Sequence, residues 1–229
     1  ETVICNSIGM IAAGNGVVFN PHPNAIATSN YAVDLVNRAS AMAGGPRILV
    51  SSVVKPTLDT ANIMYKDPRI KLLVCTGGPG VVKSVLSSGK KAIGAGAGNP
   101  PVIVDDTADI RKAGKDIIDG CTFDNNLPCI AEKEVFAFNN IADELITNMT
   151  QNGAYFLNSA QAEQLKSFAL VEKDGKYSIN KKWVGKNAGL FLKELGISAD
   201  PRLIICETTA DHPFVVHELM MPILPIVRV

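Results

Sequence analysis

Short apolar runs alternate with stretches of helical spacing through the first half of this sequence. Strands are expected at Val17–Phe19, Ile48–Ser52, Leu72–Cys75, Lys91–Gly94 and Val102–Val104, and helices at Asn24–Ala43, Thr57–Lys66 and Val81–Ser88. Strands that are apolar throughout and alternate with helices are typical of a parallel sheet covered on both faces. We therefore predict an α/β fold that binds its ligands at the carboxyl ends of the strands.

Residues 120–229 continue this alternation less regularly. Strands are expected at Glu134–Phe138, Arg202–Cys206 and Pro222–Val227, and helices at Ile141–Gln151, Ala160–Phe168 and Trp183–Leu195. The polar, glycine-containing segment Val171–Asn180 indicates a surface loop or hairpin. We place the domain boundary near Asp119–Thr122, which gives two domains, residues 1–119 and residues 120–229.

Charge and cysteine usage exclude several classes of protein. Lys plus Arg and Asp plus Glu both number 22, so nothing indicates a nucleic-acid partner. No apolar stretch is long enough to span a bilayer, and no signal peptide opens the chain. The odd count of five cysteines, without close pairs, argues against a disulfide framework or a structural zinc site and indicates a reducing cytoplasm. No metal site is predicted.

Both ends of the sequence read as cut. The first residue is Glu1 rather than Met, and it is expected to enter a helix at once. The last residues, Pro222 to Val229, read as a strand with nothing after it. We interpret the chain as a fragment of a longer enzyme.

Two glycine-rich segments follow predicted strands. Thr76-Gly77-Gly78-Pro79-Gly80 lies between a strand and a helix, where glycines let a backbone approach a phosphate at the positive end of the helix. The spacing matches neither the dinucleotide fingerprint nor a P-loop, so a tight turn and a phosphate site are equally good interpretations. The segment Gly94–Pro101 indicates either a close approach of backbone or ligand, or a flexible loop.

Cys129 follows Pro128 in a loop of turn-forming residues. A Cys in a constrained loop near a cofactor can act as a thiolate nucleophile, but on this segment alone a buried, inert Cys is the commoner case. Cys75 and Cys206 lie inside apolar strands and are expected to be buried. For Cys121 the sequence does not decide between a buried and a reactive thiol.

His22 and Glu218 are the other candidates for contact with a ligand. His22 lies between two prolines after the first expected strand, where it either touches a cofactor or simply completes a turn. Glu218 precedes the buried strand that begins at Pro222 and, on position alone, reads as an acid facing solvent.

Five segments, in this order, resemble the aldehyde dehydrogenase superfamily over essentially the whole chain. Ala12–Phe19 is similar to its A-x-G-N-x-V-V-x strand, Thr76–Gly78 to its T-G-S cofactor turn, and Asn99–Asp109 to its G-G-K-S-P-x-I-V…D-A-D stretch. Asn125–Ala131 falls on its nucleophile segment, and Glu218–Pro222 is similar to its E-x-F-G-P motif. Any single match is weak, but five matches in order are specific.

The closer similarity is to the CoA-acylating branch of this superfamily. Within that branch the sequence most resembles the propionaldehyde, acetaldehyde and butyraldehyde dehydrogenases of bacterial microcompartments and fermentative clostridia. The segments that carry the similarity are Asn20–Pro23, Thr76–Gly80, Ser87–Lys90, Ile93–Asn99, Phe123–Asn126 and Pro128–Val135.

The resemblance implies a partial Rossmann-like NAD-binding domain over residues 1–119 and a partial catalytic α/β domain over residues 120–229. Cys129 would be the catalytic nucleophile. The cofactor-binding residues would be Thr76, Gly77, Gly78, Pro79, Gly80, Gly96, Glu218, Pro21 and His22. In this assignment the turn Thr76–Gly80 lies under the pyrophosphate and Glu218 binds the nicotinamide ribose.

Two departures from the hydrolytic members have chemical consequences. The position of their Glu general base is Ala95, which cannot activate water, so an acyl-enzyme would persist for a thiol acceptor. The family's Lys and Glu for the adenosine ribose fall at Asn20 and Pro23, which leaves the choice between NAD and NADP open.

The implied reaction is the oxidation of a short-chain aldehyde, propionaldehyde first, by NAD or NADP, with coenzyme A as co-substrate and a thioester on Cys129. The implied setting is a cytoplasmic homo-oligomer, either free or inside a bacterial microcompartment, and in the latter case with its shell and the diol or glycerol dehydratase enzymes as partners. Two alternatives stay open: an acyl-phosphate reductase of the same superfamily, and an inactive nucleotide-binding or assembly fragment.

Overall fold

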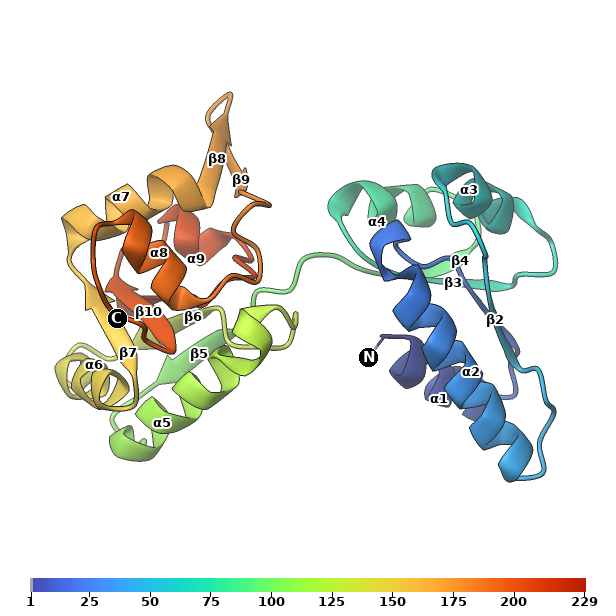
Figure 1. Ribbon diagram of the computed structural model, residues 1–229, viewed down its shortest axis with the longest axis horizontal. Coiled ribbons are helices and arrows are strands. Elements are labelled where there is room, and N and C mark those ends of the chain that lie inside the picture. The colour runs from blue at the N-terminus through green and yellow to red at the C-terminus, as the bar shows by residue number, and fades with distance from the viewer. Residues whose placement is uncertain (1) are drawn as a thin grey trace. The chain divides into compact units, whose positions relative to one another are not determined.

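The computed structural model describes residues 2–229, and the chain forms two compact units that divide after Gly96. Each unit is described by itself (Figure 1). Helix α1 is described over Thr2–Ala12, and Glu1, where the helix was expected to begin, lies outside the described residues. Within residues 2–229 no helix combines the length and the apolar character that crossing a membrane requires.

The first unit opens with a helix pair and a parallel strand pair. Helix α1 is followed by β1 (Val17–Phe19), the short 3-10 helix η1 (Pro23–Ala25), α2 (Ile26–Met42) and β2 (Val50–Ser52). Strands β1 and β2 pair in parallel, with Val17 opposite Val50. The Asn37 side chain joins α2 to this pair, because its amide donates to the Val50 carbonyl at 2.8 Å and its oxygen accepts from the Val50 N–H at 3.0 Å.

A second parallel pair completes the first unit. Its elements are α3 (Leu58–Lys66), β3 (Leu72–Thr76), α4 (Pro79–Leu86) and β4 (Lys91–Ala95). Leu73 and Cys75 are buried with Val85 of α4, whereas Leu72 and Val74 on the other face of β3 are 41% and 38% exposed. The expectation that both faces are covered is therefore wrong for β3.

The second unit is built on one five-stranded parallel sheet in the order β5-β6-β11-β10-β7. Its strands are β5 (Pro101–Val104), β6 (Glu134–Ala137), β7 (Ala154–Leu157), β10 (Leu203–Glu207) and β11 (Ile223–Arg228), and its helices are α5 (Ile110–Cys121), η2 (Phe123–Asn126), α6 (Ala142–Gln151), α7 (Ser159–Ala169), α8 (Ala188–Glu194) and α9 (Pro213–Val216). An antiparallel hairpin of β8 (Leu170–Lys173) and β9 (Lys176–Ile179) confirms the hairpin alternative for Val171–Asn180.

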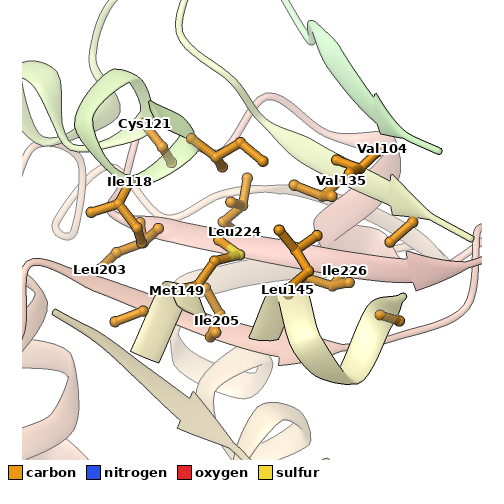
Figure 2. Close-up of a cluster of buried hydrophobic side chains, with 14 of the residues drawn as sticks. Val104, Ile118, Cys121, Val135, Leu145, Met149, Leu203, Ile205, Leu224 and Ile226 are labelled. Carbon is orange, nitrogen blue, oxygen red and sulfur yellow. The ribbon is translucent and has the colours of Figure 1, made fainter. Parts of the chain in front are cut away.

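Both faces of the sheet are buried along its central strands β10 and β11, whereas Ile103 of the edge strand β5 is 72% exposed. Helices α5 and α6 cover one face, where Leu145 and Met149 pack against Ile205, Leu224 and their neighbours (Figure 2). Helices α7, α8 and α9 cover the other face, through side chains such as Leu165, Phe191 and Phe214 (Figure 1). Successive residues of β10 and β11 alternate between the two clusters, as the period of a strand requires.

The division between the units differs from the boundary expected near Asp119–Thr122. Strand β5 pairs with β6, and α5 contributes Ile117, Ile118 and Cys121 to the core of the second unit. Residues 97–119 therefore belong to the second unit. The pattern of residues does not reveal this division, because β5 is a short strand that follows β4 as the earlier strands follow one another, and its partner β6 lies beyond α5 and η2 in the chain.

Candidate functional site

The candidate phosphate turn follows β3 as the sequence predicts. Thr76 ends β3 beside Ala95 of β4, Gly78 is the N-cap of α4, and Pro79 occupies its first turn. A Cβ placed on Gly77, Gly78, Gly80 or Gly96 would meet no heavy atom of the described residues within 4 Å. The backbone before α4 is thus open to a ligand, and the helix N-terminus there favours negative charge.

Pro21 and His22 follow β1, on the other parallel pair of the first unit. His22 caps η1, because its Nδ1 accepts a hydrogen bond from the Asn24 N–H at 3.2 Å. Asn20 is tied to α3, since its side-chain oxygen accepts from the Thr60 hydroxyl at 2.8 Å. The turn role of His22 is therefore observed, and its contact with a cofactor stays a prediction.

Cys129 lies in the loop between η2 and β6, and this loop begins with a strained backbone. Asp124, Asn125 and Asn126 have φ angles of 47°, 52° and 62°, in the left-handed region that Asn and Asp tolerate better than most residues. The Asn125 amide donates to the Gly185 carbonyl at 3.0 Å and to the Asn187 side chain at 2.8 Å. These bonds fix the start of the loop against the segment before α8.

Cys129 is exposed, whereas the other cysteines of the second unit, Cys121 and Cys206, are fully buried. Burial raises the pKa of the Cys206 thiol to about 12 and that of Cys121 further still, so neither forms a thiolate at neutral pH. The backbone of Gly98 lies against Cys129, since a Cβ on Gly98 would be 2.4 Å from the Cys129 carbonyl oxygen. Cys129 is therefore the accessible thiol of residues 97–229.

A buried lysine lies behind the loop. The Lys133 ammonium is 1% exposed and donates to the Asn126 carbonyl oxygen at 2.6 Å and to the Asn126 side-chain oxygen. The Asn126 amide donates in turn to the Cys121 sulfur and to the Glu132 carbonyl, both at 3.0 Å. Burial lowers the pKa of Lys133, and the charges of Glu218, Cys121, Cys129 and Glu134 oppose that shift.

Two carboxylates belong to the same region. Glu218 follows α9, and the Asn99 amide holds α9 in place by donating to the Val215 carbonyl at 2.7 Å. Glu134 is 4% exposed at the start of β6, and burial raises its pKa to about 7. One of its carboxyl oxygens, Oε2, is buried without a hydrogen-bond partner among the described residues.

The predicted site residues fall into two groups. The first unit holds Thr76–Gly80, Gly96, Pro21 and His22, and the second unit holds Cys129 and Glu218. Within the second unit, Glu218 and Cys129 both favour the charged form of Lys133. In residues 2–229 no three His, Cys, Asp or Glu side chains gather as a metal site would require.

Sequence reasoning missed Lys133, Asn126 and Gly98. One signal for Lys133 existed in its spacing: it precedes Val135 by two residues, and Val135 faces the core from β6. Residues two apart in a strand face the same side, so Lys133 is expected on the buried side with Val135. A lysine in such a position is unusual and indicates a cation that is paired, for a structural or a functional reason.

Comparison with known proteins places the chain in a family. The model of the aldehyde dehydrogenase family matches residues 2–229. The acetaldehyde dehydrogenase (acetylating) EutE of Escherichia coli K12 is 46% identical over 233 aligned residues, which cover 100% of this chain and 50% of the relative. The chain thus spans about half the length of the curated relatives it matches.

Solved structures give the same result. A propionaldehyde dehydrogenase from the fucose utilisation microcompartment of Clostridium phytofermentans is 56% identical, with a TM-score of 0.90 over 99% of this chain and 52% of that one. A propionaldehyde dehydrogenase of Rhodopseudomonas palustris, solved with bound CoA and an acylated cysteine, is 53% identical, with a TM-score of 0.89 over 100% of this chain and 52% of that one. The chain belongs to the aldehyde dehydrogenase family.

Proposed function

We propose that this chain is part of a CoA-acylating aldehyde dehydrogenase. The enzyme converts a short-chain aldehyde, propionaldehyde first, together with NAD and CoA to acyl-CoA and NADH. The observation that carries the proposal is the exposed Cys129 on a loop tied down on both sides. Support comes from the 53% identity to an enzyme solved with CoA and an acylated cysteine.

The reaction proceeds through Cys129 in two halves. Its thiolate attacks the aldehyde carbonyl carbon, forming a C–S bond and an oxyanion that accepts a hydrogen bond from the Cys129 backbone N–H. A bound NAD, held by the residues assigned below, would supply the hydride acceptor, and loss of hydride from that carbon would leave a thioester on Cys129. The CoA thiolate then attacks the thioester, the C–S bond to Cys129 breaks, and acyl-CoA departs.

The residues of the first unit suit the proposed cofactor. The open backbone of Gly77 and Gly78 before α4 provides N–H groups and a helix N-terminus for a pyrophosphate. We assign Pro21 and His22 to its adenine end and Gly96 to close backbone approach. In the second unit we assign Glu218 as the hydrogen-bond acceptor for the nicotinamide ribose hydroxyls.

The side chain at Ala95 favours transfer to a thiol over hydrolysis. Its methyl group can take no proton from water, so the general base that hydrolytic members use is missing from that position. The thioester on Cys129 therefore resists hydrolysis and persists until CoA attacks it.

Pre-steady-state kinetics of the full-length enzyme tests the proposal. With propionaldehyde and NAD but without CoA, we expect a burst of NADH no larger than the number of active sites. After the burst, the rate of NADH formation should fall close to zero. Addition of CoA should restart turnover and yield propionyl-CoA. Sustained NADH formation with release of free acid before CoA is added would contradict the proposal, and reduction of an acyl phosphate in preference to acyl-CoA would favour the acyl-phosphate reductase.

We also propose that the full-length enzyme is a homo-oligomer housed in a bacterial microcompartment of the cytoplasm. There it would consume the aldehyde released by a diol or glycerol dehydratase. Support comes from the structural relative of a fucose utilisation microcompartment. Cell fractionation is the test: the enzyme should sediment with shell proteins, and its recovery wholly in the free soluble fraction would contradict this placement.

A further inference from the structure

Lys133 is the largest of the fully buried side chains in the described structure. Removing an ammonium group from water costs several kcal/mol unless it is paired and hydrogen-bonded. A methionine or leucine would fill the same volume without that cost. The contacts around Lys133 should therefore explain why a charged side chain occupies this buried position.

The contacts of Lys133 close the loop that carries Cys129. Its ammonium binds both the carbonyl and the side-chain oxygen of Asn126, seven residues earlier in the chain. Asn126 has a φ of 62° and is fully buried, and its amide returns to the Glu132 carbonyl at 3.0 Å. The segment from Asn126 to Lys133 is thus a closed ring, with Cys129 at its exposed tip.

The backbone of Lys133 also fixes the opposite wall. Its N–H donates to the Pro100 carbonyl at 3.0 Å, which joins the start of β6 to the segment that contains Gly98. Gly98 lies in contact with the backbone of Cys129. One residue therefore connects the loop that carries Cys129 to the irregular segment packed against the backbone of Cys129.

The charged groups around Lys133 come from several elements. Glu218 approaches from the segment after α9, Glu134 from β6, Cys121 from α5, and Cys129 from the loop itself. Three of these four carry or can carry negative charge in the reaction described above. Their negative charges oppose the effect of burial and favour the protonated form of Lys133.

We infer that Lys133 is a positioning residue for the reaction of Cys129. Its ammonium, held by both oxygens of Asn126, keeps the loop closed and keeps Cys129 in register with Gly98. The inference rests on the proposed function, and it concerns the first half-reaction, formation of the thioester.

Variants of the full-length enzyme test this role. Lys133→Met removes the ammonium and keeps the length of the side chain, Lys133→Arg keeps a charge, and Lys112→Met on the exposed face of α5 is the matched control. In single-turnover acylation without CoA, Lys133→Met should be slower by about a hundredfold, the effect of a displacement of about 1 Å, with a far smaller change in aldehyde affinity. Lys133→Arg should recover most of the rate, and Lys112→Met should match the wild type.

The pH profile gives a readout that a purely structural role would not move. Burial lowers the pKa of Lys133 from its ordinary value, so acylation by the wild type should decline on the alkaline side as the ammonium loses its proton. A guanidinium stays protonated there, so Lys133→Arg should show no such decline. An identical alkaline decline in the wild type and in Lys133→Arg would overturn the inference.

The outcomes separate this inference from the proposed function. Wild-type rates of acylation in Lys133→Met would overturn the role of Lys133 while leaving the proposed function intact. Failure of the wild type to form any thioester would reject the proposed function. In that case the alkylation rate of Cys129 by iodoacetamide still tests Lys133, since a released loop changes that rate and an unchanged rate counts against the inference. If Lys133→Met does not fold, the alkaline profiles of the wild type and Lys133→Arg decide.

Discussion

Accessibility separates Cys129 from its neighbour Cys121. Cys121 is the last residue of α5, is fully buried and accepts a hydrogen bond from Asn126, whereas Cys129 is exposed at the tip of its loop. Cys129→Ser should abolish thioester formation in the full-length enzyme, because a hydroxyl at neutral pH is a far weaker nucleophile than a thiolate. Cys121→Ser keeps an acceptor for Asn126 and should retain most of the activity. Comparable losses in the two variants would reject the assignment of the nucleophile.

Glu134 makes stability depend on pH. Its pKa is about 7 in the folded chain, above the ordinary value of 4.5, so between these values the folded state binds more protons than the unfolded state. Stability should therefore fall as pH rises through that window and stay reduced above it. At about 1.4 kcal/mol per pKa unit, the loss is up to about 3 kcal/mol.

Thermal melting of Glu134→Gln checks this effect. The variant should gain melting temperature relative to the wild type at about pH 8 and little at about pH 5, because the neutral amide carries no buried charge at either pH. Other titrating groups are common to both proteins and cancel in the comparison. Equal gains or losses at the two pH values would show that the carboxyl does not titrate in this window.

At the scale of elements, the close approach of Gly98 to the Cys129 loop controls the geometry of the thiol. A Cβ on Gly98 would lie 2.4 Å from the Cys129 carbonyl oxygen and 2.9 Å from its Cβ, so the loop must move in Gly98→Ala. We expect alkylation of Cys129 by iodoacetamide to change and acylation to slow by about tenfold or more. Gly9→Ala is the control, since a Cβ there meets nothing within 4 Å. Wild-type acylation in Gly98→Ala would show that the loop tolerates the shift.

The sequence predicted most elements, and its failures have identifiable causes. Helix α5 was not predicted from the sequence. Its Gly114 allows a close helix crossing, since a Cβ there would lie 2.9 Å from the Asn148 Cβ, and this tertiary contact is not visible in the sequence. The helix expected over Trp183–Leu195 begins only at Ala188, because Gly185 has a φ of 69° and interrupts it. Lys133 was missed because its burial depends on Asn126, a tertiary partner that spacing does not reveal.

At the scale of the whole molecule, the proposed reaction assigns roles to residues of both units. Ala95 ends β4 in the first unit and Cys129 belongs to the second. Under the proposed function, the fate of the thioester depends on both residues. In the full-length enzyme, Ala95→Glu should raise the ratio of free acid to acyl-CoA, because a carboxylate at the position of the missing base can activate water. A product ratio equal to that of the wild type would mean that water is kept out by other means.

Mass spectrometry of the trapped acyl-enzyme identifies the nucleophile without relying on kinetics. The full-length enzyme is given propionaldehyde and NAD without CoA, quenched in acid and digested, and the peptides are searched for a propionyl group. We expect propionylation of the peptide carrying Cys129, its loss when CoA is added before the quench, and none on Cys121 or Cys206. A propionyl group on another residue, or its absence from Cys129 after the NADH burst, would rule out Cys129 as the nucleophile.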